Sequence, residues 1–381
     1  MTVGSLWAQN LMTTNPPNPT RLGDCVLSSS AIRFLTVWLA HDGVKSRNVA
    51  LKIVQAKSTA RSQEPNVLER LRAFNSTAGQ KPYVIQLLDS FEHTSANGIH
   101  QVLVTEPVVP LLALYSRYSK FQPQITNDVL RQTIEGLAYI HSHGIAHGDL
   151  YPANFGRNTN FPHCDPHSYP PYLCGNLDLG EFLGLRAPDI VGRPLSVRIF
   201  DFGSAYIVDG SVPPRPVTPP FYAAPEIVFP QVALNKEDPP WDQRSDIWSL
   251  GVAFHDLVEL PHYMVCICGE IPAAWRDHVD SQPWPLDFTP DMTEEFWDGR
   301  KELFAQLGVE DPPGLVRLMR RMLVLDPAKR PSAQDLLDDP YFSCSNGAQN
   351  VVGSIHPLMQ LPTGVPYGEA ADLRLNLPTL D

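Results

Sequence analysis

Two carboxylates and one carboxamide stand at a spacing that suits phosphoryl transfer. Asp149 and Asn154 lie in the stretch IAHGDLYPAN, and Asp201 opens the triplet DFG downstream. A carboxylate on an exposed turn can accept the proton of a substrate hydroxyl. Amide and carboxylate oxygens can hold Mg²⁺ against nucleotide phosphates. Each side chain taken alone could simply stabilise a turn, but their order along the chain predicts that all three are catalytic.

Lys52 supplies the cation that such a site needs. It lies in the strand-like stretch NVALKIV, where Val49 and Leu51 point to one face and Ala50 to the other. A lysine in this place can reach the α- and β-phosphates of a nucleotide. A lone lysine here would be interpreted as a solvated strand residue, whereas the downstream residues favour a catalytic one.

The ammonium of Lys52 requires an anionic partner from the helix expected after it. Glu64 is the first choice and Glu69 is the second. Because proline fits only the first turn of a helix, Pro65 predicts that this helix begins at about Glu64.

Four more polar residues are expected to support the site. Asp246, in the stretch SDIWSLG, can anchor the turn around Asp149 from a buried helix. Glu226, in the stretch AAPE, can form a buried ion pair with Arg330. His147 is expected to stabilise the turn rather than to transfer protons.

The apolar periodicity divides the chain into a β-rich part and a mainly helical part. Strands are predicted at residues 36–40, 48–54, 83–90 and 100–105, and a helix is predicted at 64–72. Further helices are predicted at residues 128–143, 245–260, 315–325 and 332–337. The 38 prolines, about twice the usual share, predict long loops at 157–195, 212–230 and 272–313.

Composition narrows the class of protein. The 381 residues suit a two-lobed unit of roughly 250–300 residues with tails. The net charge of −12 argues against nucleic-acid binding and permits a basic protein partner. No signal pattern and no stretch near the ~20 apolar residues of a membrane span occurs, so we expect no membrane association.

The cysteines indicate a reducing compartment. The six thiols lack the density of a disulfide scaffold, so we expect the cytoplasm, the nucleus or both. The His, Cys and Asp residues at 163–174 lack the paired spacing of a zinc site.

The stretches VALK, HGDLYPAN, DFG and AAPE, in this order, resemble the signature set of protein kinases. TVWLA at 36–40, VIQLLDSF at 84–91 and SDIWSLG are similar to the SR-protein kinase family, in particular to its fungal members. The resemblance implies an α+β, two-lobed protein kinase fold. It also implies transfer of the γ-phosphate of ATP, with Mg²⁺, to serine in Arg/Ser-rich splicing proteins.

The resemblance also implies where the domains and the nucleotide contacts lie. The domains would be a flexible segment at 1–20, an N-lobe at 21–108, a C-lobe at 109–345 and a flexible tail at 346–381. The nucleotide would be contacted by Val37, Ala50, Lys52 and main-chain groups of Glu106 and Val108. Mg²⁺ would be held by Asn154 and Asp201. We expect a monomer.

Four positions depart from the family pattern. Ser30 and Ile32 stand where the phosphate-covering loop has glycines, and this loop is also short. Gly148 replaces an arginine that binds a phosphorylated activation loop, which suggests activity without that phosphorylation. Tyr151 replaces a lysine that neutralises the γ-phosphate, which should cost rate. An active kinase and a pseudokinase that acts as a scaffold or nucleotide-binding module therefore both stay open.

Overall fold

The computed structural model describes residues 25–26, 35–42, 45, 47–59, 62–78, 83–96, 98–110, 123–158, 196–210, 213–214, 217–219, 221–228, 241–256, 268 and 290–344. Four sequence-based expectations fall outside these residues: the flexible ends at 1–20 and 346–381, the loop positions Ser30 and Ile32, and the His, Cys and Asp cluster at 163–174.

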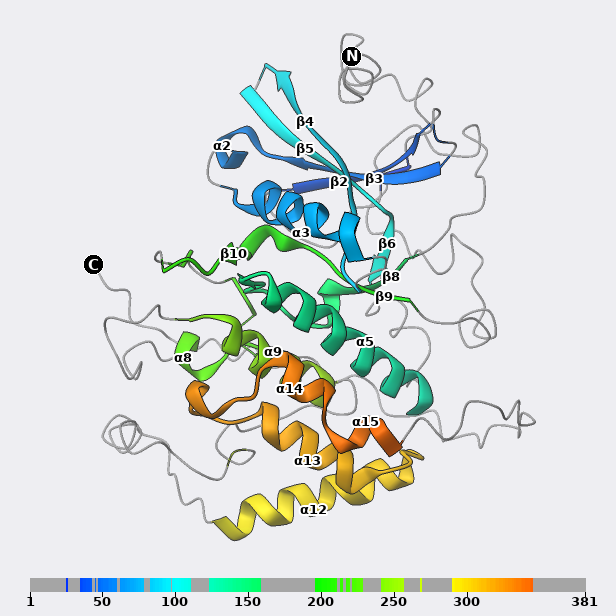
Figure 1. Cartoon of the computed structure of the whole chain (residues 1–381), viewed down its shortest axis with the longest axis vertical. Coiled ribbons are helices and arrows are strands. Elements are labelled where there is room, and N and C mark those ends of the chain that lie inside the picture. Colours follow the sequence, from blue (N-terminus) through cyan, green and yellow to red (C-terminus); the bar gives the residue numbers. More distant parts are fainter. Residues whose placement is uncertain are drawn as a thin grey trace, which may run out of the picture. The chain divides into compact units, whose positions relative to one another are not determined.

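A five-stranded antiparallel sheet forms the N-terminal part of the fold (Figure 1). Its strands are β1 (Cys25–Val26), β2 (Leu35–Asp42), β3 (Arg47–Val54), β4 (Leu87–Ser95) and β5 (Gly98–Thr105), in the order β1-β2-β3-β5-β4. Val49 and Leu51 of β3 are buried in one core cluster with Val102 and Val104 of β5. Because strand side chains alternate, Lys52 points to the opposite face of the sheet.

The strand predicted at residues 83–90 is wrong in its first half. β4 begins only at Leu87. Residues 83–86 are extended but bond elsewhere: the Ile85 N–H donates to the Ile199 carbonyl, and the Ile199 N–H donates to the Tyr83 carbonyl, both at 2.9 Å. The apolar pattern therefore identified an extended stretch correctly, but it could not show that the two halves have different partners.

Two helices follow β3. They are α2 (Ala56–Thr59) and α3 (Glu64–Ala78). α3 begins at Glu64, as Pro65 predicted, because the missing N–H of proline costs nothing in the first turn. Val67, Leu68 and Leu71 form its buried face.

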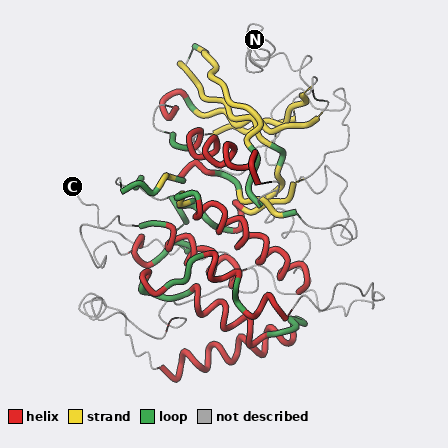
Figure 2. The backbone as a smooth tube through the Cα atoms, viewed as in Figure 1, coloured by secondary structure: helices red, strands yellow, loops and turns green. Residues whose placement is uncertain are grey.

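The rest of the described chain is mainly helical (Figure 2), which confirms the predicted α+β architecture. Its helices are α5 (Pro123–Ser142), α8 (Pro225–Val228), α9 (Gln243–Asp256), α12 (Pro290–Gln306), α13 (Pro312–Met322), α14 (Ala333–Leu337) and α15 (Pro340–Cys344). Short 3-10 turns are η1 (Pro152–Asn154), η3 (Phe202–Ser204) and η6 (Pro327–Lys329). None of the helices in the described part of the chain has both the length and the apolar character to cross a membrane.

Two small sheets lie among these helices. β6 (Val108–Pro110), β8 (Phe155–Asn158) and β9 (Val197–Ile199) form one, and β7 (Ile145–Ala146) pairs with β10 (Tyr206–Ile207) in the other. Both sheets are antiparallel. They hold the chain on either side of Asp149 and Asp201, since β7 and β8 flank the first residue and β9 and β10 flank the second.

The loop predicted at residues 272–313 is wrong over α12. That helix runs from Pro290 to Gln306, and α13 starts at Pro312 rather than at the predicted residue 315. Both helices start at prolines, because proline is tolerated in the first helical turn. Ser332 caps α14 as its sequence suggested, with the Asp335 N–H donating to Ser332 Oγ at 3.1 Å.

A buried ion pair fixes α8 against the turn before α14. Arg330 Nη1 donates to Glu226 Oε1 at 2.7 Å, and Nη2 donates to Oε2 at 2.9 Å. The guanidinium also donates to the carbonyls of Val324, Arg244 and Leu325. Such a pair is tolerated in the interior because its hydrogen-bonding groups are matched.

We expect Arg330→Met to destabilise the fold by about 3–5 kcal/mol, because it leaves the Glu226 carboxylate buried without its cation. Urea unfolding followed by circular dichroism measures the change. The double variant Glu226→Leu/Arg330→Met removes both charges and should recover most of the loss. Equal destabilisation of the single and double variants would show that packing, not the ion pair, dominates here.

Candidate active site

The turn that carries Asp149 is anchored to α9 by one buried carboxylate, that of Asp246. Asp246, in the first turn of α9, accepts the N–H groups of His147 at 2.8 Å and Gly148 at 2.9 Å. His141 Nε2, at the end of α5, lies 3.0 Å from the same carboxylate. Since Asp246 is only 1% exposed, the turn is fixed to the helical core rather than to a surface loop.

His147 is a structural part of this turn. Its Nδ1 accepts the Asp149 N–H at 3.3 Å, and its Nε2 lies 3.2 Å from the Phe200 carbonyl. Burial lowers the pKa of His147 below its ordinary value, so the ring is neutral. With both nitrogens engaged, the imidazole has none left for proton transfer.

One carboxylate oxygen of Asp149 accepts a hydrogen bond, and the other has no donor among the described residues. Asn154 Nδ2 donates to the Asp149 carbonyl at 2.7 Å and to Oδ2 at 3.0 Å. Oδ1 is buried and has no hydrogen-bond partner among the described residues. Burial, followed by the charge of Asp201, raises the pKa of Asp149 to about 7. A buried acceptor without a donor is uncommon, and here it offers a place for a substrate hydroxyl.

Lys52 joins two carboxylates that come from different parts of the chain. Its Nζ donates to Glu64 Oε1 at 2.6 Å and to Asp201 Oδ1 at 2.7 Å. Burial alone would lower the pKa of Lys52, but the carboxylates of Asp201 and Glu64 outweigh it and raise that pKa. Glu69, the second choice from the sequence, bonds instead to Ser90 and Arg72 on the exposed side of α3.

Asp201 reaches this cluster through an unusual backbone. Its φ of 63° and ψ of 72° lie in the left-handed region, which costs about 1–3 kcal/mol for a residue other than glycine. Phe202 beside it is fully buried and packs on the His147 ring, with centroids 4.9 Å apart. The Gly203 N–H donates to Asp201 Oδ1. The ion pair between Lys52 and Asp201 and the packing of the buried Phe202 ring together stabilise this strained turn.

The donor chemistry of this cluster fits Mg²⁺. Two carboxylates, those of Glu64 and Asp201, bond to the ammonium of Lys52, and Asp149 interacts electrostatically with both Asp201 and Lys52, so carboxylates outnumber the ammonium here. Asn154 uses its amide nitrogen toward Asp149, which leaves its carbonyl oxygen as the atom a cation would bind. No group of three or more metal-binding side chains is preformed in the described part of the chain. Mg²⁺ ordinarily takes one or two protein ligands, and phosphates and water complete its coordination.

The residues expected around the nucleotide lie near Lys52 in the sheet. Val37 is the register partner of Lys52, and Ala50 pairs with Thr105, directly before Glu106. The Glu106 N–H already donates to the Gln86 carbonyl, so its own carbonyl is the main-chain group it can offer. Val108 is the first residue of β6.

Two features of the site were not found in the sequence. Arg198 of β9 donates from Nε to Glu106 Oε1 at 2.8 Å, in a buried pair that links Glu106, two residues before Val108, to the strand before Asp201. A lone arginine inside the apolar strand VRI is a signal that could have shown this pair.

Tyr151, which the sequence analysis identified in place of a lysine, packs beside Tyr222 with ring centroids 5.6 Å apart.

The second missed feature is Trp241, which occupies the space beside Gly148. A Cβ at residue 148 would lie 2.3 Å from the indole of Trp241 and 3.0 Å from the Ser204 carbonyl. The φ of Gly148 is +71°, which side chains rarely adopt. No arginine can therefore stand at this position while Trp241 keeps its place.

Trp241 also secures the segment between Asp201 and Glu226. Its Nε1 donates to the Pro214 carbonyl at 3.0 Å, and its carbonyl accepts from the Tyr206 hydroxyl at 2.8 Å. Thr218 Oγ1 donates to the Gly148 carbonyl at 2.7 Å. The segment is thus tied to the turn of Asp149 by uncharged contacts.

We expect Gly148→Ala to destabilise the protein by about 1–3 kcal/mol, because the new methyl group collides with Trp241 and strains φ. Urea unfolding followed by circular dichroism measures the loss. Gly148→Ala/Trp241→Leu should be less unstable than the sum of its single variants, since the smaller side chain relieves the collision. Additive losses would contradict a steric coupling between the two positions.

Comparison with known proteins shows which family the chain is similar to. A family model described as the protein kinase domain matches residues 33–342. A serine/threonine protein kinase of Aspergillus fumigatus is 26% identical over 368 residues, which cover 85% of this chain and 87% of that protein. The mitogen-activated protein kinase HOG1 of Kluyveromyces lactis is 26% identical over 336 residues, which cover 81% of this chain and 61% of that kinase. HOG1 of Saccharomyces cerevisiae is 27% identical over 334 residues, or 81% and 62%.

Proposed function

Because the chain belongs to the protein kinase family, we propose that it transfers the γ-phosphate of ATP to a serine or threonine hydroxyl of a protein. The observation that carries this proposal is Asp149, a half-buried residue whose Oδ2 accepts from Asn154 and whose buried Oδ1 has no hydrogen-bond donor among the described residues. That free oxygen can accept the hydroxyl proton as the substrate oxygen bonds to phosphorus and ADP departs.

The other residues of the site are proposed to bind ATP and Mg²⁺ and to orient them. Lys52 is proposed to hold the α- and β-phosphates, and Glu64 keeps the ammonium in place at 2.6 Å. Asn154 and Asp201 are proposed as the Mg²⁺ ligands. Bound Mg²⁺ would neutralise the phosphate charge that develops during transfer. Val37 and Ala50, with the main chain of Glu106 and Val108, are proposed to line the adenine site.

The proposed substrates are serine or threonine residues in basic proteins. Two kinds of observation support serine and threonine: the relatives named as serine/threonine and mitogen-activated protein kinases, and the resemblance of TVWLA and SDIWSLG to SR-protein kinases. The net charge of −12 suits a basic, Arg/Ser-rich protein substrate. Such a kinase would act as a monomer in the cytoplasm, the nucleus or both.

A pseudokinase that binds nucleotide or acts as a scaffold is the second candidate. Tyr151 favours it, because a tyrosine cannot neutralise phosphate as a lysine does. Ser30 and Ile32 favour it too, although they lie outside the described residues. The full set of Lys52, Asp149, Asn154 and Asp201, held at bonding distance, favours the enzyme.

We expect Asp149→Asn to lower kcat by about 10²–10⁴-fold, because the amide cannot accept the hydroxyl proton. Transfer of radiolabelled phosphate from Mg-ATP to an Arg/Ser-repeat peptide measures this. The thermal midpoint and the Kd for ATP should stay near those of the unchanged protein. If the unchanged protein folds and binds ATP but transfers nothing, the pseudokinase becomes the better description.

We also expect that activity does not require phosphorylation of the segment between Asp201 and Glu226, because Trp241 and Thr218 already tie it to the turn. Treatment with a protein phosphatase before the assay should leave the rate unchanged within experimental error. Intact-mass spectrometry confirms that no phosphate remains. A large loss of rate after dephosphorylation would show that the uncharged contacts are insufficient.

A further inference from the structure

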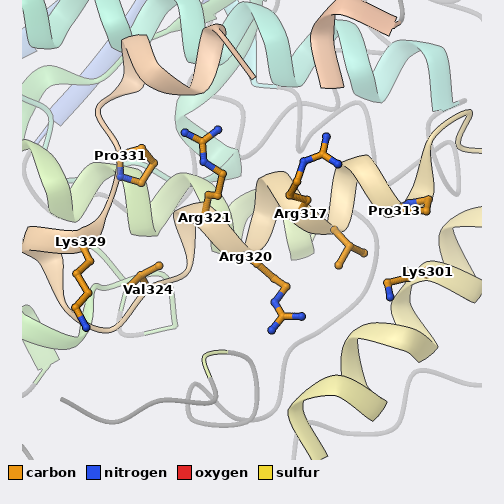
Figure 3. Close-up of a pocket in the computed structure, with 9 residues that line it drawn as sticks. Lys301, Pro313, Arg317, Arg320, Arg321, Val324, Lys329 and Pro331 are labelled. Atoms are coloured by element: carbon orange, nitrogen blue, oxygen red, sulfur yellow. The ribbon is translucent and has the colours of Figure 1, made fainter. Parts of the chain in front are cut away.

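A basic groove lies in the C-terminal part of the fold, between α12 and the end of α13 (Figure 3). It has a volume of about 640 Å³, within the range of ligand sites. Five cationic side chains line it: Lys301, Arg317, Arg320, Arg321 and Lys329. The groove belongs to a chain with a net charge of −12, so this concentration of positive charge runs against the overall balance.

Most of the cations that line the groove already pair with a carboxylate, and Lys329 is the exception. Arg317 and Arg321 share one buried acceptor, Asp339, which also accepts the Tyr341 N–H. Arg320 pairs with Glu294 and Lys301 pairs with Asp298, and Asp335 also interacts electrostatically with Arg321. Lys329 is exposed and forms no ion pair with any described residue.

The two sides of α13 differ in what they can offer to a ligand. Figure 3 shows Arg317 and Arg321 extending to one side of the helix, and Arg320 and Lys329 extending to the other. The first pair is committed to Asp339, whose side chain is 1% exposed. Among the described residues, Arg320 bonds to Glu294, whose side chain is 58% exposed, and Nη1 and Nη2 each donate to one carboxylate oxygen at 2.9 and 2.6 Å. Because Glu294 faces water, a ligand carboxylate can compete with it for the guanidinium.

Apolar residues between these cations indicate the kind of ligand. Pro313, Val316, Val324 and Pro331 line the same groove. A ligand that presents carboxylates and aliphatic side chains in alternation can satisfy both kinds of lining. A nucleic acid carries an unbroken row of phosphates, which the net charge of −12 of this chain disfavours.

We propose that this groove binds a short acidic peptide segment of a partner protein, in which Glu or Asp alternates with aliphatic residues. Lys329 and Arg320 receive the carboxylates, and Pro313, Val324 and Pro331 receive the aliphatic groups, since Val316 is only 2% exposed. α12 and α13 lie at the far end of the helical part from the five-stranded sheet that carries Lys52 (Figure 1). The groove is therefore separate from the proposed site of phosphoryl transfer.

The probe for this proposal is a fluorescein-labelled octapeptide of alternating Glu and Leu, followed by fluorescence anisotropy with the full chain and no ATP. We expect saturable binding that weakens as salt rises, because charge attraction is screened. The matching Gln-Leu peptide should bind at least about tenfold more weakly, a difference of about 1.4 kcal/mol. Equal binding of the two peptides, or none, would overturn the proposal.

Charge-reversal variants locate the site. Lys329→Glu should raise the Kd of the Glu-Leu peptide about tenfold or more, whereas Lys45→Glu should change it less than about twofold. Lys45 is a matched control, since it is also an exposed lysine and lies in the N-terminal sheet region, away from the groove. Arg320→Gln/Lys329→Gln serves if the reversed charge disturbs folding, which the thermal midpoint reports.

Two outcomes would overturn the assignment. Equal weakening by Lys329→Glu and Lys45→Glu would show that only the overall charge matters. Tighter binding of a single-stranded DNA octamer than of the Glu-Leu peptide would identify nucleic acid as the better ligand. Because the assay contains no ATP, its result does not depend on whether the chain transfers phosphate.

Discussion

One buried ammonium connects the three parts of the site. Lys52 stands on β3, Glu64 is the first residue of α3, and Asp201 follows β9, yet both carboxylates bond to the same nitrogen. Without Lys52, the two carboxylates would face each other in the interior, where like charges repel strongly. The positions of α3 and of the turn at Asp201 relative to the sheet therefore depend on this one cation.

Local rules in the sequence were sufficient for much of the fold. The start of α3 followed from the tolerance of proline in a first turn, and the cap of α14 followed from Ser332. Pro290 also stands in the first turn of a helix, but the many prolines of residues 272–313 predicted a loop there, so the prediction missed α12. Proline carries two opposite signals, a break inside a helix and a start at its first turn, and only tertiary packing decides between them.

The spacing of Asp149, Asn154 and Asp201 indicated the site, but its fine structure depends on contacts between distant residues. The sequence ranked Glu64 before Glu69 as the partner of Lys52, but only the packing of α3 shows that Glu64 bonds to this lysine whereas Glu69 bonds to Ser90. The partner of residues 83–86 required knowing that β9 lies beside them. The Glu106–Arg198 pair joins residues 92 positions apart, and the lone arginine in the apolar strand VRI indicates a buried cation without showing which carboxylate is its partner.

The indole of Trp241 leaves no room for a residue larger than glycine at position 148. A larger residue in place of the glycine alone would introduce a collision and a strained backbone, whereas a smaller residue in place of the tryptophan alone would leave a cavity. Either single change therefore costs stability. The two positions are coupled, because a side chain at residue 148 requires a smaller residue at position 241.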